Sequence, residues 1–111
     1  MEDVIKQMTQ PELIQYIVTE GCKYLGIKYP IEDYGVKNRK YIIMALRTYT
    51  LATYLEIARL LSFQGYLVVL KAHRRIEDEL SDNVYGYEKT KLIYNNFLTY
   101  LKLQKNDTIT T

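Results

Sequence analysis

Apolar residues recur at intervals of three and four positions along most of this 111-residue chain. That spacing places them on one face of an α-helix, whereas a half-buried strand would alternate apolar and polar residues. Five Gly and two Pro divide the chain sparsely. The pattern therefore predicts an all-α fold, a small bundle of about five helices.

The first predicted helix begins at a Thr-x-x-Glu pattern, Thr9 to Glu12, which is typical of a capping box. Gly26 is expected to end it. Residues 27–36 contain Pro30 and Gly35 and are expected to connect to a second helix over about residues 38–48. The side chains expected to face the core from these helices are Leu13, Ile14, Ile17, Val18, Tyr24, Leu25, Ile42, Ile43, Leu46 and Tyr49.

A second Thr-x-x-Glu pattern, Thr53 to Glu56, predicts a helix of about two turns. Residues 62–65 supply a turn, in which Phe63 is expected to fill the space between this helix and the next. The next helix begins near Tyr66 and is expected to bury a stripe at helical spacing. The members of that stripe are Val69, Ala72, His73, Ile76 and Leu80. Residues 53–80 thus predict a helix-turn-helix unit.

A last helix is predicted from about residue 88 to residue 103. Its expected inward side chains are Leu92, Ile93, Phe97, Tyr100 and Leu101. The acidic run before it is interpreted as a solvated helix end, and its members are Glu77, Asp78, Glu79 and Asp82. Residues 1–104 form one predicted domain, and residues 105–111 a polar tail that is expected to be disordered.

Composition narrows the class of protein. Hydrophobic residues make up 48% of the chain, ample for one core. The longest apolar runs are far shorter than the roughly 20 residues that cross a bilayer, so we expect no membrane span. The start, MEDVIKQM, does not resemble a secretory signal. With Cys22 as its one cysteine, the chain has no internal disulfide, and a cytoplasmic protein is expected.

Charge is unevenly distributed. Between Lys37 and Arg75 the chain has eight Lys or Arg and one acid, Glu56, whereas the remaining residues carry seven basic and twelve acidic groups. A basic segment of this kind in a small domain is typical of a polyanion binder.

The helix-turn-helix interpretation assigns roles to the basic and polar residues. Lys71, Arg74 and Arg75 face away from the apolar stripe and are expected to neutralise phosphates. Gln64 and Tyr66 would lie nearest the base edges, since a Gln amide can pair with adenine. The segment before the second helix is expected to reach the DNA as an arm does. Its residues are Lys37, Asn38, Arg39 and Lys40. A solvated helix face, an ordinary turn and a charged loop remain the alternatives.

Leu67 and Val68 are also predicted to face outward. Exposed aliphatic side chains would contact only thymine methyls on DNA and more often mark a protein interface. The alternative function is therefore a protein-interaction module on a retained helix-turn-helix scaffold, binding a second copy of itself or a host factor through this surface.

The segment from Arg39 to Leu80 resembles the C-terminal DNA-binding domain of the bacterial replication initiator DnaA. The matching residues are Thr53, Glu56, Ile57, Ala58 and Arg59 in the short helix, and Val69, Leu70, Ala72, Arg74, Arg75 and Ile76 in the recognition helix. Residues 24–27, YLGI, resemble the end of that family's first helix. The positions of its base-reading Arg, Asp, His and two Thr are occupied by Gln64, Gly65, Tyr66, Leu67 and Val68. The resemblance implies duplex DNA binding by a stand-alone relative, such as one from a phage or mobile element. Such a protein would be located on the nucleoid or, if phage-encoded, in the host cytoplasm.

The sequence offers few candidate residues for a catalytic or metal-binding site. His73 is the one histidine, lies on the apolar stripe and is expected to be a core or half-buried ring. One Cys and one His do not fill a tetrahedral metal site. No Ser, His and Asp set and no carboxylate pair is found in an apolar setting. We therefore expect a non-enzymatic protein without cofactor that acts in replication or transcription by occupancy or recruitment.

Overall fold

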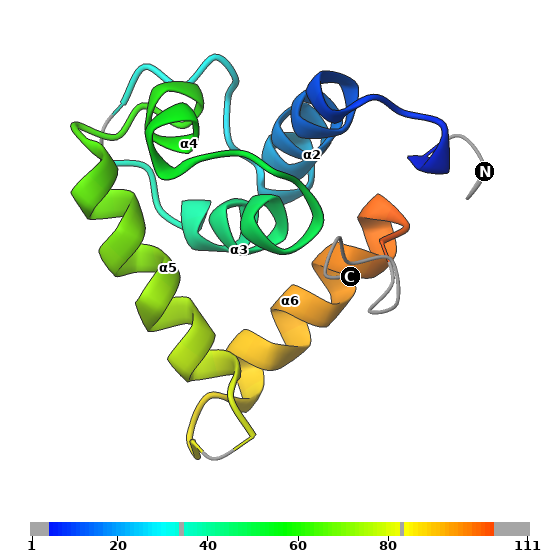
Figure 1. Cartoon of the computed structure of the whole chain (residues 1–111). Helices are drawn as coiled ribbons and strands as arrows, with labels where there is room; N and C mark the ends of the chain where they lie inside the picture. The colour runs from blue at the N-terminus through cyan, green and yellow to red at the C-terminus, as the bar shows by residue number, and fades with distance from the viewer. Residues whose placement is uncertain (1–4, 34, 83, 104–111) are drawn as a thin grey trace.

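The computed structural model describes residues 5–33, 35–82 and 84–103 of the chain. Within these residues the fold is all-α, as predicted, and contains no strand (Figure 1). Its helices are α2 (Gln10–Leu25), α3 (Arg39–Tyr49), α4 (Tyr54–Leu60), α5 (Tyr66–Leu80) and α6 (Glu88–Leu101). The predicted tail, residues 105–111, lies outside the described residues.

Local signals determine where α2 and α4 begin and where α2 ends. The Thr9 hydroxyl accepts a hydrogen bond from the Glu12 N–H, and the Glu12 carboxylate accepts one from the Thr9 N–H. Thr53 and Glu56 form the same reciprocal pair, with both distances at 3.1 Å. Gly26 adopts the left-handed conformation with φ 71°, which a glycine tolerates without strain. Both predicted capping boxes and the predicted stop are confirmed.

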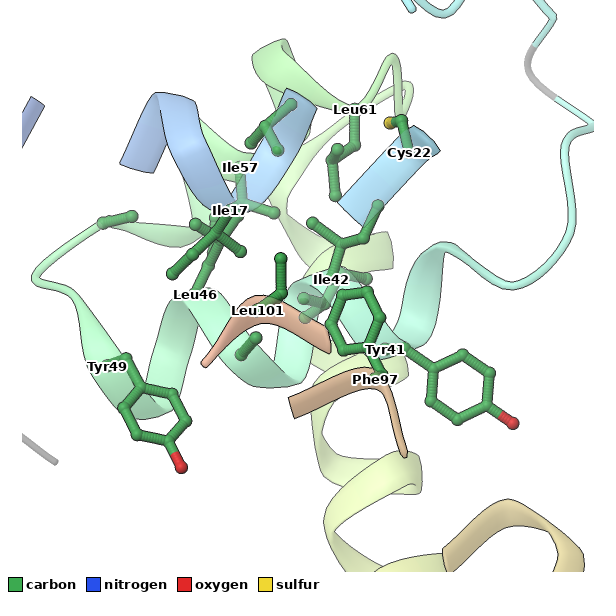
Figure 2. Packing of buried hydrophobic residues seen from close by; sticks show 14 of the residues in the cluster. Ile17, Cys22, Tyr41, Ile42, Leu46, Tyr49, Ile57, Leu61, Phe97 and Leu101 are labelled. Atoms are coloured by element: carbon green, nitrogen blue, oxygen red, sulfur yellow. The ribbon is translucent and has the colours of Figure 1, made fainter. Parts of the chain in front are cut away.

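The core cluster contains buried side chains from each of α2 to α6, and those of α3 lie near the centre of Figure 2. α3 packs against α2, α5 and α6. Ile42 of α3 lies between Ile17 of α2 and Phe97 of α6 in that view, and Leu46 lies next to Ile17. A Cβ at Gly21 would stand 3.1 Å from the Phe97 ring and 3.2 Å from Ile42. The glycine therefore allows α2 to approach both neighbours closely.

The inward face of α6 differs from the prediction at its first turns. Leu92, expected in the core, is 61% exposed. The buried stripe consists of Tyr94, Phe97, Leu98 and Leu101, whose spacing of three, four and seven is that of one helix face. Leu92 precedes Tyr94 by two positions and therefore points to the other side of the helix. Three aromatic rings decide the register, because Tyr94 packs on both Tyr41 and Phe97.

α4 and α5 pack against each other and are joined by residues 61–65. Leu61 is fully buried, and Ser62 takes the left-handed conformation with φ 59°. The Ser62 hydroxyl donates to the carbonyl of Ile31, which ties the turn to the loop before α3. Phe63 is partly buried against the core. The Arg39 guanidinium lies over its ring, 3.8 Å from the ring centroid.

α5 runs along one edge of the molecule in Figure 1, with α3 and α4 on its inner side. In the part of the chain that the structure describes, no helix has the length and apolar character needed to span a membrane.

Candidate nucleic-acid interface

The inner and outer faces of α5 separate as the apolar stripe predicts. Val69, His73 and Ile76 are buried, and Ala72 and Leu80 are partly buried against the core. The outward side chains are all exposed, and they are Leu67, Val68, Lys71, Arg74 and Arg75. The five predicted outward residues therefore share one solvent-facing surface, which we call the α5 outer face.

Two cations of the α5 outer face have no acidic partner among the described residues. Lys71 and Arg74 form no ion pair with any residue in the described ranges. Arg75 donates from Nε to the Glu79 carboxylate at 3.2 Å, one helical turn away, while 82% of its side chain is exposed. The guanidinium of Arg75 thus remains accessible, but part of its charge is neutralised within the helix.

The turn before α5 contributes polar and apolar groups to the same end of the surface. Gln64 is exposed, and Tyr66 is 51% exposed. Leu67 and Val68 follow at 53% and 48% exposure. The first turn of α5 is therefore apolar on its outer side, and the cations begin one turn later, at Lys71.

Arg39 does not belong to an exposed arm. Its residue is 7% exposed, and its guanidinium donates to the carbonyls of Val36, Leu61 and Ser62 at 3.0, 2.7 and 3.1 Å. The same group stacks on the Phe63 ring at 3.8 Å. Burial lowers the pKa of Arg39. This arginine fastens the start of α3 to the turn before α5 and is not available to a phosphate.

Glu79 corrects the interpretation of the acidic run as a solvated end. It is 5% exposed, and its carboxylate lies 3.0 Å from Lys40 Nζ of α3. With Arg75 on its other oxygen, it joins two cations that were expected to face DNA. α5 ends at Leu80, the last member of the predicted stripe. Lys40 is therefore a half-exposed partner of a buried carboxylate.

The rest of the predicted arm lies on the surface. Lys37 and Asn38 are exposed. Asn38 occupies the position before α3 in the left-handed conformation, with φ 72°, and its side chain makes no capping hydrogen bond. Lys37 and Asn38 remain accessible, whereas Arg39 and Lys40 are engaged by the protein.

A polar network connects three helices behind α5. Arg47 of α3 stacks on the Tyr54 ring of α4 at 4.1 Å and donates to the carbonyl of Ala52. The Tyr54 hydroxyl is hydrogen-bonded to Nδ1 of His73 at 2.8 Å. Burial lowers the pKa of His73, and the Arg47 charge adds to this effect, while Glu77 opposes it. The histidine is a buried structural ring, as expected.

No group of three or more His, Cys, Asp or Glu suited to a metal ion occurs among the described residues. Cys22 is buried, and burial raises the pKa of its thiol. A thiol held in its protonated form is a weak nucleophile.

The inward positions of Arg39 and Glu79, though not their partners, had a signal in the sequence. Arg39 precedes Ile42 and Ile43 by three and four positions, and Glu79 follows Ile76 by three. Both therefore lie on the buried stripes of their helices. Charged residues are rarely buried unless they are paired, so the stripe predicts their burial only once the partners are known.

The chain matches no protein-family model, no curated protein and no solved structure. The structure thus defines an all-α domain with an exposed cationic helix face.

Proposed function

We propose that this protein binds duplex DNA through α4, the following turn and α5, with α5 in the major groove. One observation carries the proposal. Lys71 and Arg74 are exposed next to each other on the α5 outer face and have no acidic partner among the described residues. Unpaired cations on one helix face can neutralise successive phosphates and release their counterions.

The turn supplies groups of a second kind to the same surface. Gln64 has both donor and acceptor atoms on its amide and is exposed at the N-terminal end of α5. A helix that enters the major groove presents this end to the base edges. Gln64 and Tyr66 would read bases, Lys71, Arg74 and Arg75 would contact phosphates, and Lys37 and Asn38 would touch the flanking backbone. Binding would act by occupancy or recruitment, as in a stand-alone DnaA-like domain.

The test is a gel-shift series with mixed-sequence duplex DNA at several salt concentrations. Replacing Lys71 and Arg74 together by Ala should weaken binding to every duplex and reduce the slope of log K against log salt by about two units. A matched control replaces Lys28 and Lys89, which are exposed outside α5, by Ala. An unchanged slope in the α5 variant, or an equal reduction in the control, would contradict the proposal.

A protein interface is the second candidate, and a specific observation favours it. Tyr66, Leu67 and Val68 expose about half of their surfaces side by side on the first turn of α5. Burying an aliphatic side chain of this size stabilises an association by about 1.5–3 kcal/mol. If these residues form the interface, replacing Leu67 and Val68 by Ser should abolish association in sedimentation while the core remains intact. Duplex affinity should change only modestly if DNA is the partner.

A further inference from the structure

A hollow of about 540 Å³ lies between the start of α2, the connection from α3 to α4, and one side of α4. All three segments contribute to its apolar wall, which consists of Pro11, Ile14, Leu51 and Leu60. Leu51, on the connection, is 70% exposed. A mostly apolar wall and a volume of roughly 300–1,000 Å³ are typical of a site for a small molecule.

A hydrogen bond joins the two segments on one side of this hollow. The Gln10 side-chain oxygen accepts from the Leu51 N–H at 2.9 Å, which ties the first turn of α2 to the connection before α4. Because the oxygen of the amide is the acceptor, its NH₂ group is the part of Gln10 that remains for a ligand. That NH₂ group donates to no other described residue.

Arg59 supplies a second donor that is open to solvent. Its side chain is exposed, lines the hollow, and forms no ion pair or hydrogen bond within the described ranges. Glu56, one helical turn earlier, lines the hollow as well. Its Oε1 accepts from the Thr53 N–H in the capping box of α4. The acid of this wall is thus partly engaged by the protein, whereas the guanidinium is not.

The balance of these groups selects the kind of ligand. The free donors of Gln10 and Arg59 face a carboxylate that already accepts a hydrogen bond from the backbone. A guanidinium presents parallel N–H donors that match the two oxygens of a carboxylate. An acceptor with a negative charge therefore complements the polar side of the hollow, and an apolar body complements the rest.

We propose that this hollow binds a small carboxylic acid with an apolar body, in its ionised form. The body rests on the apolar wall, and the carboxylate pairs with Arg59 and accepts from the Gln10 NH₂ group. The site is separate from the proposed DNA contacts, because it shares no residue with them.

Naphthylacetate is a suitable probe, because it joins a bicyclic apolar body to one carboxylate. Its matched comparisons are naphthylacetamide, which is uncharged, and naphthylethylamine, which is a cation. In an NMR titration of the full chain, saturable shifts are expected at the amides of Ile14, Leu51, Arg59 and Leu60. A molecule of this size is expected to bind in the millimolar range, with the acid tightest and the amine weakest.

Arg59→Gln is the decisive variant, because it removes the cation at an exposed position. Naphthylacetate affinity should fall about fivefold, the scale of a solvent-exposed ion pair, while naphthylacetamide affinity should hardly change. Lys89→Gln is the matched control, since it changes net charge equally at an exposed residue outside the hollow. It should leave the affinity for the acid unchanged.

Two further variants test the other parts of the wall. Glu56→Gln removes the like charge and keeps a side chain that can complete the capping box, so naphthylacetate should bind more tightly. Leu51→Ser removes an exposed part of the apolar wall and should weaken the acid and the amide alike.

Several outcomes would overturn the proposal. One is the absence of saturable shifts with naphthylacetate. Another is tighter binding of naphthylethylamine, which would mean that Glu56 governs the hollow. Equal losses in Arg59→Gln and Lys89→Gln would reduce the effect to net charge. Shifts confined to Thr48, Tyr94 and Leu98, which line a separate hollow, would place the acid elsewhere.

Discussion

α3 and α5 each carry three cations, yet the two helices use them in opposite ways. On α3, Arg39 is bound to backbone carbonyls, Lys40 to Glu79, and Arg47 to the ring of Tyr54. On α5, Lys71 and Arg74 are exposed and have no ion pair in the described ranges. A local excess of Lys and Arg therefore does not by itself define a polyanion surface. A polyanion surface is defined by the number of cations that remain accessible to a ligand.

The comparison predicts that replacing the buried Arg39 destabilises the fold much more than replacing the exposed Arg59. Arg39→Ala would leave the carbonyls of Leu61 and Ser62 without their buried donor and uncover the Phe63 ring. We expect a loss of about 2–4 kcal/mol in the free energy of unfolding, measured by chemical denaturation. Arg59→Ala, at an exposed position of α4, is the control and should stay within about 0.5 kcal/mol of wild type. Equal losses in both variants would refute the contrast.

Glu79→Gln tests the link between the two helices. The change removes the charge that holds Lys40 and Arg75 and should lower the free energy of unfolding by about 1–2 kcal/mol. It should also release Arg75 to the α5 outer face and thereby increase duplex affinity and steepen the salt slope.

The matched control for this second effect is Glu77→Gln. It changes net charge by the same amount on the same helix, but Glu77 is exposed and does not contact Arg75. If both variants bind duplex DNA alike, net charge alone explains the gain, and the pairing of Arg75 has no role in binding.

His73 should make the free energy of unfolding depend on pH, with a smaller effect than the Arg39 and Glu79 substitutions. Its pKa is lowered in the folded protein, so the unfolded chain takes up the proton first as pH falls. The contribution of His73 to the free energy of unfolding is complete above its unfolded pKa of 6.5. It is lost as pH falls from there through the lower pKa of the folded protein. His73→Gln should remove this part of the pH dependence, measured by denaturation between pH 8 and pH 5. An identical profile in the variant would show that other groups carry it.

The smallest expected change in stability concerns the exposed cations. Replacing Lys71 and Arg74 together by Ala should alter the free energy of unfolding by no more than about 0.5 kcal/mol, because both side chains are exposed and neither forms an ion pair with a described residue. Thermal melting of this variant is the necessary partner of the gel-shift test. A large drop in the melting temperature would mean that these residues support the fold and are not a free binding surface.

The helices were predictable because their signals are local. Thr9 and Glu12, and likewise Thr53 and Glu56, meet within one turn, so their spacing alone predicts the caps. The inward stripe of α5 was predictable for the same reason. Leu92 shows the limit of this reasoning, because periodicity allows two neighbouring registers for α6. The packing of Tyr94 on Tyr41 and Phe97 selects one of them.

The candidate interface was predictable in part. The outward positions of Lys71, Arg74 and Arg75, and the exposure of Gln64 and Tyr66, follow from the stripe opposite them. The pairing of Arg39 and Lys40 with the protein does not follow from local sequence. Arg39 binds the carbonyls of Leu61 and Ser62, 22 and 23 positions away, and Lys40 binds Glu79, 39 positions away.

By itself the sequence determined the all-α class, the helix starts and the two faces of α5, since each depends on residues within a few positions of one another. The tertiary structure alone decided which cations remain free for a ligand. A charged side chain enters the interior only where carbonyls, a carboxylate or an aromatic ring from another helix compensate for its lost hydration. The fold brings such groups to Arg39, Lys40 and Arg47, and leaves Lys71 and Arg74 in water.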